Sequence, residues 1–160
     1  MKLIKFAIIS IITIFIIVTA IGLLLPSTVL VSRTIETTSS ADSVFKYTKD
    51  LMGWKQWAAA LQNVSIYSPH ETQIGKSILK INSKNNRLIA GEWIEENGKT
   101  QQIKLQIIER ERITIINWQF QQKVSWFPID RFGSIVNEKV IGKMMEDNLA
   151  ELKNLLEKSE

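Results

Sequence analysis

The sequence predicts an α+β fold in which a long C-terminal helix lies across the open face of an antiparallel β-sheet. Two short helices are expected after the first strand, and one transmembrane helix before it. Three observations predict this arrangement: an uncharged apolar segment near the N-terminus, a series of strand-like runs in the middle, and helical spacing of apolar residues near the end. A chain of 160 residues has room for these elements as one domain with one appendage.

The appendage is the uncharged segment from Phe6 to Leu25, FAIISIITIFIIVTAIGLLL. At about 1.5 Å per helical residue it reaches roughly 30 Å, the thickness of a bilayer core. We therefore expect residues 1–25 to be a membrane anchor and residues 26–160 to be the domain. A cleaved signal peptide is the alternative, since Val18-Thr19-Ala20 resembles a cleavage site. Cleavage there leaves IGLLLP as an apolar N-terminus, which favours the uncleaved anchor.

The charges predict an orientation and exclude one class of partner. Lys2 and Lys5 precede the apolar segment and Arg33 is the first charge after it, so we expect a cytoplasmic N-terminus and an exported domain on the periplasmic or extracellular face. The absence of cysteine suits an oxidising compartment. The formal net charge is only +4 and no basic patch carries interleaved aromatic residues, so nucleic acid is not an expected partner.

The first strand and the two short helices follow directly. Alternation in TVLVSRTIET predicts a strand over 28–37. Ser39 or Ser40 can cap a helix in which Val44, Phe45, Thr48 and Leu51 recur at helical spacing, and Gly53 is expected to end that helix. A second short helix is expected from Trp54 to Leu61, which places Trp54 and Trp57 on one face.

The middle of the chain predicts an antiparallel meander. Strands are expected over 64–69, 74–81, 87–96, 101–108 and 111–121. Asn85-Asn86 and Asn97-Gly98 mark hairpin turns, the second of them expected to be type I′. Ile103, Leu105 and Ile107 alternate with polar residues, which indicates one buried face and one wet face.

Helical spacing returns after WFPID and continues to the C-terminus. The apolar stripe consists of Ile135, Val136, Val140, Met144, Leu149, Leu152, Leu155 and Leu156. Gly133 and Gly142 are expected to interrupt it, so the most regular part is 143–158. This part has the length to lie across the open face of a curved sheet.

Three stretches carry a resemblance to a known family. They are LLLPSTVLVSRTI at the junction of anchor and first strand, ADSVFKYTKDLMGWKQW across the short helices, and FPIDRFGSIVNEKVIGKMMEDNLAELKNLLE at the end. In this order they resemble the helix-grip fold of the START/polyketide cyclase superfamily, also called SRPBCC, and in particular a bacterial subgroup with an N-terminal membrane anchor. The resemblance implies an antiparallel β-sheet wrapped around the long C-terminal helix, enclosing a cavity that, in various family members, holds lipids, sterols, polyketides or other hydrophobic molecules. It implies no shared catalytic residues.

Aromatic residues are the candidates for lining such a cavity. They are Trp54, Trp57, Trp93, Trp118, Phe120 and Trp126, with Phe127 beside the last of them. Aromatic side chains are also strong packing anchors without any ligand, and core packing is the simpler interpretation for Trp54 and Trp57. Aromatic content alone does not distinguish a cavity from a solid core.

Candidates for acid-base chemistry are few. Glu92 shares one face of its predicted strand with Leu88, Ala90 and Ile94, so it is either an inward carboxylate with a raised pKa or a residue of the outer face. Asp130 and His70 are weaker candidates, and His70 is simplest as a solvated loop residue. One histidine and no cysteine make a zinc site or a thiol nucleophile implausible, and no phosphate or dinucleotide motif is present, so no metal or cofactor is expected.

Three functions remain open at the level of sequence. The favoured one is a membrane-anchored domain that binds a hydrophobic small molecule or lipid without catalysis. The alternatives are a cyclase- or dehydratase-like enzyme that uses an inward carboxylate, and a ligand-free interaction module with a solid core. The interior distinguishes them: an apolar cavity favours binding, convergent acids favour catalysis, and no cavity favours the interaction module.

Overall fold

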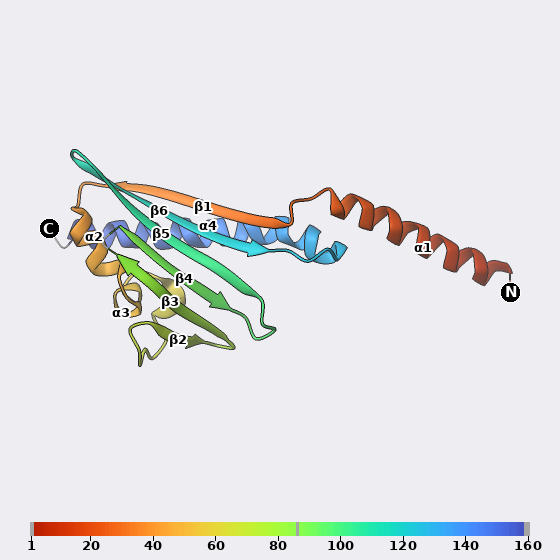
Figure 1. Ribbon diagram of the computed structural model, residues 1–160, viewed down its shortest axis with the longest axis horizontal. Coiled ribbons are helices and arrows are strands. Elements are labelled where there is room, and N and C mark those ends of the chain that lie inside the picture. The colour runs from red at the N-terminus through yellow and green to blue at the C-terminus, as the bar shows by residue number, and fades with distance from the viewer. Residues whose placement is uncertain (1, 86, 159–160) are drawn as a thin grey trace.

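The computed structural model describes residues 2–85 and 87–158. The element order confirms the predicted α+β class (Figure 1). The elements are α1 (Lys2–Leu23), β1 (Thr28–Thr37), α2 (Ala41–Thr48), α3 (Leu51–Trp54), a 3₁₀ turn η1 (Ala59–Leu61), β2 (Glu71–Ile74), β3 (Ser77–Asn85), β4 (Leu88–Ile94), β5 (Thr100–Arg110), β6 (Ile113–Lys123) and α4 (Pro128–Lys158).

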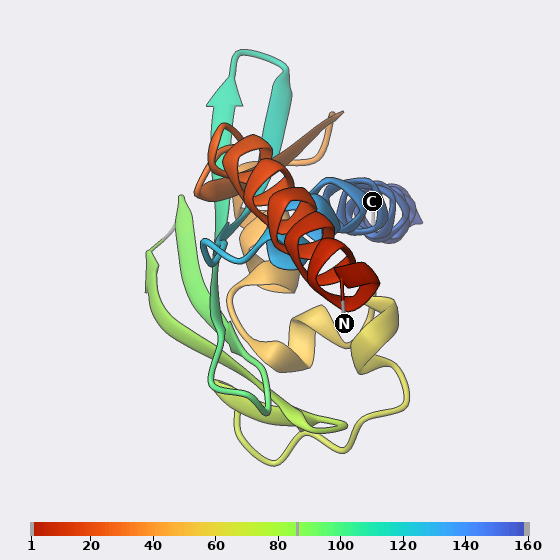
Figure 2. The same cartoon turned by 90° about the vertical axis from the view of Figure 1, so that its right-hand side faces the viewer.

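The strands form one antiparallel sheet in the order β1-β6-β5-β4-β3-β2. The last five strands are a meander, and β1 returns to pair with β6 along its whole length. Seen from the α1 end, the sheet curves around the short helices and α4 (Figure 2). This is the wrapped sheet that the resemblance implies, with β1 and β2 as its edges.

The core fills the concave face of the sheet. Ile103, Leu105 and Ile107 of β5 are buried as the alternation predicts, and the residues between them are exposed. The helix α4 covers them with Met145, Leu149, Leu152 and Leu156, each of them fully buried. Because these four residues recur every three or four positions, they form one apolar face of α4.

The helix α1 projects from one end of the molecule (Figure 1), and nearly all of its side chains are exposed. By length and composition it is able to cross a membrane. Its only buried residue among those described is Gly22, which packs against Pro128 and Arg131 at the start of α4.

The region between the short helices and β3 differs from the prediction. Ser40 caps α2 through its side chain, but α2 ends at Thr48, and Gly53 lies inside a separate helix, α3, capped by Asp50. The helix expected from Trp54 to Leu61 is wrong, since only the short turn η1 forms there. No strand forms over 64–69.

The strand expected over 74–81 is split in two. Gly75 forms the turn between β2 and β3 with a φ of +59°, and such a positive φ favours glycine.

The turn at Asn97-Gly98 is not type I′, because of these two residues only Gly98 has a positive φ. The Gly98 N–H donates to the Glu95 carbonyl, and the Glu95 N–H donates to the Lys99 carbonyl, both at 2.9 Å. These hydrogen bonds identify a type I turn followed by a glycine bulge. At the other predicted turn, Asn85 accepts the backbone N–H groups of Arg87 and Leu88, while Asn86 lies outside the described residues.

The C-terminal helix is longer than predicted. It begins at Pro128, a residue that suits a first helical position, and neither Gly133 nor Gly142 interrupts it. Its amino-terminal half buries Arg131, Ser134 and Gly142. Ile135, Val136, Val140 and Met144, expected as one stripe with the leucines, are exposed instead.

Candidate functional site

A small cavity lies between the concave face of the sheet, the segment 54–61 and α4. It measures about 30 Å³ and is partly enclosed. Its lining is almost wholly apolar and consists of Trp54, Ala58, Ala60, Leu61, Leu79, Trp93, Ile103, Trp118, Phe120, Met144 and Asn148. This is the position that the resemblance implies for a ligand.

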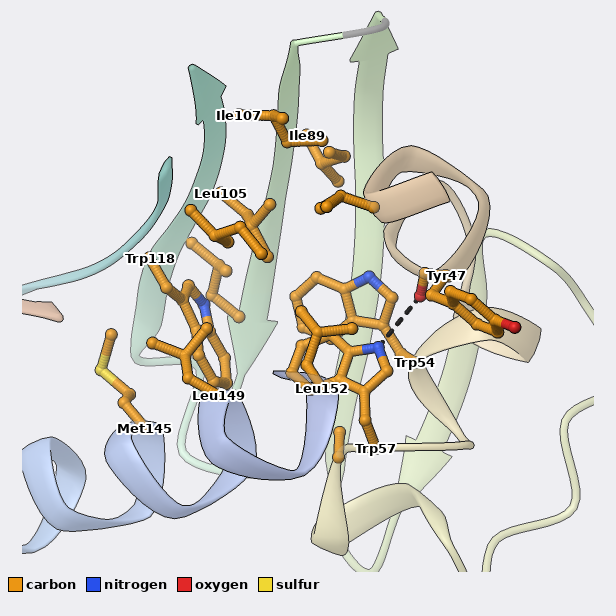
Figure 3. Packing of buried hydrophobic residues seen from close by; sticks show 14 of the residues in the cluster. Tyr47, Trp54, Trp57, Ile89, Leu105, Ile107, Trp118, Met145, Leu149 and Leu152 are labelled. Carbon is orange, nitrogen blue, oxygen red and sulfur yellow. Dashed lines mark hydrogen bonds between the residues drawn. The ribbon is translucent and has the colours of Figure 1, made fainter. Parts of the chain in front are cut away.

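Trp54 and Trp57 hold the short helices to the sheet. The Trp54 Nε1–H donates to the carbonyl of Thr48 at 2.6 Å, and the Trp57 Nε1–H donates to the carbonyl of Tyr47 at 2.9 Å, as Figure 3 shows for the second bond. Both rings are buried, with centroids 5.0 Å apart. These bonds satisfy carbonyls at the end of α2, so the two tryptophans have a structural role whether or not a ligand is present.

Trp118 completes an aromatic cluster with these two residues (Figure 3). Its ring stands edge-on to Trp54 and to Trp57, at centroid distances of 5.7 Å and 5.5 Å. It is buried, and its Nε1–H has no hydrogen-bond acceptor among the described residues. A buried donor without an acceptor costs about 1 to 3 kcal/mol, so an acceptor that reached this indole N–H would stabilise the protein.

Asn148 is the polar residue of the cavity wall. It is 4% exposed, and its Oδ1 accepts the backbone N–H of Ala59 at 3.0 Å. This bond ties α4 to the η1 segment across the cavity. Asn148 was not predicted as a site residue, although a lone amide between Met145 and Leu149 on the buried face of a helix was a usable signal.

The structure brings together four of the six aromatic candidates. Trp54, Trp93, Trp118 and Phe120 line the cavity, from α3, β4 and β6. Trp57 lies in the core beside them. Trp126 is 61% exposed, stacks edge-on against Phe127 next to α1, and does not line the cavity.

The acid-base candidates lie outside the cavity. On β4 the buried positions are Ile89 and Gly91, so Trp93 shares their face and Glu92 lies on the opposite one. Glu92 is therefore a residue of the outer face, opposite Lys80 and Gln102 in the neighbouring strands. His70 is exposed, and Asp130 pairs with Lys99 at 3.7 Å near the start of α4.

A wider hollow of about 740 Å³ opens to solvent beside the segment 63–68 and strands β2 and β3. Its wall mixes polar residues such as Asn63, Ser65 and Gln73 with apolar ones such as Val64 and Ile78. An open groove of this kind lacks the enclosure that small-molecule sites have. The cavity under α4 is therefore the better candidate in spite of its smaller volume.

Comparison with known proteins identifies the fold. No family model matches the chain, and no curated protein matches it. Among solved structures, a START superfamily protein from Mycobacterium smegmatis aligns with a TM-score of 0.64 and 18% identity over 82% of this chain and 99% of that one. DynU16, described as a putative protein in the dynemicin biosynthetic locus, aligns with a TM-score of 0.61 and 13% identity, over 82% of this chain and 48% of DynU16. The di-domain ARO/CYC StfQ from the steffimycin biosynthetic pathway aligns with a TM-score of 0.61 and 8% identity, over 82% of this chain and 51% of StfQ.

The chain thus spans about half the length of DynU16 and StfQ, and nearly all of the mycobacterial protein. Because the sequence identities are this low, the comparison shows similarity of fold alone. That fold agrees with the sheet, the short helices and the long C-terminal helix described above. The chain has the helix-grip fold of the START/polyketide cyclase (SRPBCC) superfamily.

Proposed function

We propose that the protein is a membrane-anchored binding domain for an apolar small molecule or lipid, held in the cavity under α4. The observation that carries this proposal is an apolar cavity lined in part by Trp118, whose buried Nε1–H has no acceptor among the described residues. Sites for small molecules are typically apolar with a few placed polar groups. The preferred ligand is accordingly an apolar molecule or chain with one hydrogen-bond acceptor, such as an ester, carbonyl or hydroxyl oxygen.

The ligand must open the cavity in order to enter it. A volume of about 30 Å³ holds about one water molecule, whereas sites for small molecules usually measure about 300 to 1,000 Å³. Met144 is the side chain most suited to move, because it is flexible and 39% exposed at the cavity wall. Each methylene that the ligand buries contributes about 0.8 kcal/mol toward this rearrangement.

The small volume also favours a second candidate function, a ligand-free interaction module with a solid core. The enzyme alternative has less support, since the cavity wall, as far as the structure describes it, consists of apolar residues and one amide. A general acid or base needs a titratable group within hydrogen-bond reach of its substrate.

Anchoring is the other half of the proposal. The helix α1 has the length of a membrane span, and only residues 24–27 separate it from β1. An extended chain gains about 3.5 Å per residue, so the domain stays close to the bilayer surface. With Lys2 and Lys5 on the cytoplasmic side, the domain lies on the exported side.

Native mass spectrometry of the detergent-extracted full chain tests ligand binding. After incubation with a long-chain fatty acid methyl ester, the wild type is expected to retain one ester molecule. Trp118→Phe keeps an aromatic ring but removes the donor, so it should weaken retention about three- to tenfold, the value of one net hydrogen bond.

The matched control is Trp126→Phe, the same chemical change at an exposed position outside the cavity. This variant should bind the ester like the wild type. A wild-type chain that retains no ester, with its fold verified by circular dichroism, would contradict the binding function and favour the interaction module.

A further inference from the structure

Large apolar side chains remain exposed at the end of the domain nearest α1. They belong to the loop before α4 and to its first turn: Trp126 is 61% exposed, Phe127 39%, Ile129 73% and Phe132 40%. We call residues 126–132 the wedge segment. Contiguous exposed apolar surface of this kind marks a contact with another protein, a ligand or a membrane.

The wedge segment packs directly against α1. The rings of Phe15 and Phe127 lie 6.5 Å apart, and Gly22 contacts Pro128. The buried guanidinium of Arg131 donates to the carbonyl of Leu25 and to the carbonyl of Ser125, both at 2.7 Å. These contacts fix the loop beside the apolar helix.

The contacts also fix how far along α1 the wedge segment reaches. Phe15 lies about two turns, roughly 12 Å, before the end of α1 at Leu23. Phe127 touches it there, whereas Arg131 bonds to Leu25 beyond the helix end. The loop therefore extends back along α1 and does not stop at its last turn.

We infer that the wedge segment inserts into the outer leaflet of the bilayer beside α1, as a second membrane-contacting element. The inference rests on the proposed anchoring by α1. If hydrocarbon surrounds α1 at the level of Phe15, it also surrounds the exposed side chains that lie at that level on the loop. Continuity with α1 therefore selects lipid as the occupant of this surface.

The polar groups of the loop are arranged in a way that suits this environment. Ser125 accepts the N–H of Phe127 through its side chain, and its own carbonyl accepts from Arg131. Pro128 has no N–H to satisfy. Backbone groups in the bilayer require partners within the protein, and these two bonds supply partners for the Phe127 N–H and the Ser125 carbonyl. Trp126 has an amphipathic ring of the type enriched at the boundary of the bilayer, and Phe127 beside it is apolar.

A depth measurement tests the inference. The chain has no cysteine, so a single cysteine introduced by Ile129→Cys can carry an environment-sensitive fluorophore. The labelled full-length protein is reconstituted into phosphatidylcholine–phosphatidylglycerol vesicles, and quenching by spin-labelled lipids is recorded. The label at position 129 should emit at shorter wavelength and be quenched by spin labels in the outer leaflet.

Two labelled controls make the outcomes distinguishable. Ile113→Cys places the label on an exposed isoleucine of the β5–β6 hairpin, at the end of the molecule away from α1 (Figure 1), and should show little quenching. Ile14→Cys reports the depth of α1 itself. Strong quenching at 14 with none at 129 overturns the wedge but leaves the anchor intact. Absence of quenching at 14 overturns the proposed anchoring and the wedge with it.

A second copy of the chain is the other occupant to be tested. If the label at 129 is shielded from water but not quenched by lipid, and the cysteine at 129 cross-links between two chains, the surface is a self-association interface. That result would also overturn insertion. The binding of ester at Trp118 is unaffected by any of these outcomes, so the cavity is tested separately.

Discussion

Trp57→Ala is expected to lower the free energy of unfolding by about 3 to 5 kcal/mol, the usual cost of removing a buried aromatic side chain. Trp57 is fully buried between the short helices and the sheet. Its removal also leaves the Tyr47 carbonyl at the end of α2 without its indole donor. Unfolding of the full chain in detergent by urea, followed by near-ultraviolet circular dichroism, measures the change.

Trp126→Ala is the matched control, since this tryptophan is 61% exposed. Its stability should stay within about 0.5 kcal/mol of the wild type. Equal loss of stability in the two variants would mean that Trp57 does not anchor the core.

Gly91→Ala is expected to destabilise the sheet by about 1 to 3 kcal/mol or more, as overpacking does. A Cβ at Gly91 would clash with the carbonyl oxygen of Lys80 on β3 and approach the Cα of Ile81 at 3.5 Å. The ladder has an irregular register just after this point, between Ile81 and Ser83. Because β3 is paired with β2 as well as with β4, its backbone has little freedom to move away.

Gly133→Ala is the matched substitution, and the opposite sign is expected. No heavy atom lies within 4 Å of a Cβ built at Gly133, which sits inside α4. In a helix interior, alanine is more stabilising than glycine by about 0.5 to 1 kcal/mol, so this variant should be more stable than the wild type. Thermal melting of both variants in detergent checks the pair, and a destabilised Gly133→Ala together with a neutral Gly91→Ala would contradict the packing described here.

Much of the fold was predictable because its signals are local. The alternation in β5 and the cap at Ser40 each depend on a few neighbouring residues, and the structure confirms both. The segment 64–69 also alternates, but a strand needs a partner, and this segment pairs with no strand of the described sheet. The start of α4 also carries a local signal, Pro128, which suits a first helical position.

The site was only half predictable. Trp118 and Phe120 follow from the strand period, because Thr114 and Ile116 on the same face are buried. For Glu92 the strand period is not enough. Both faces of β4 carry apolar residues, so the alternation shows which residues share a face but not which face points inward. Met144 and Asn148 reach the cavity through the angle at which α4 crosses the sheet, which no spacing within the helix determines.

Binding of an apolar ligand in the cavity is tested most directly by the proton–nitrogen correlation spectrum of the tryptophan indole groups, recorded on the full chain in micelles. The five tryptophans give five indole signals, assigned by single Trp→Phe variants. During titration with a fatty acid methyl ester, the Trp118 signal should move downfield as its free N–H gains an acceptor, while the Trp57 signal stays in place because its N–H already bonds to Tyr47. An unmoved Trp118 signal, with only the exposed Trp126 responding, would show that the ester enters the micelle and not the cavity, and would contradict the proposed function.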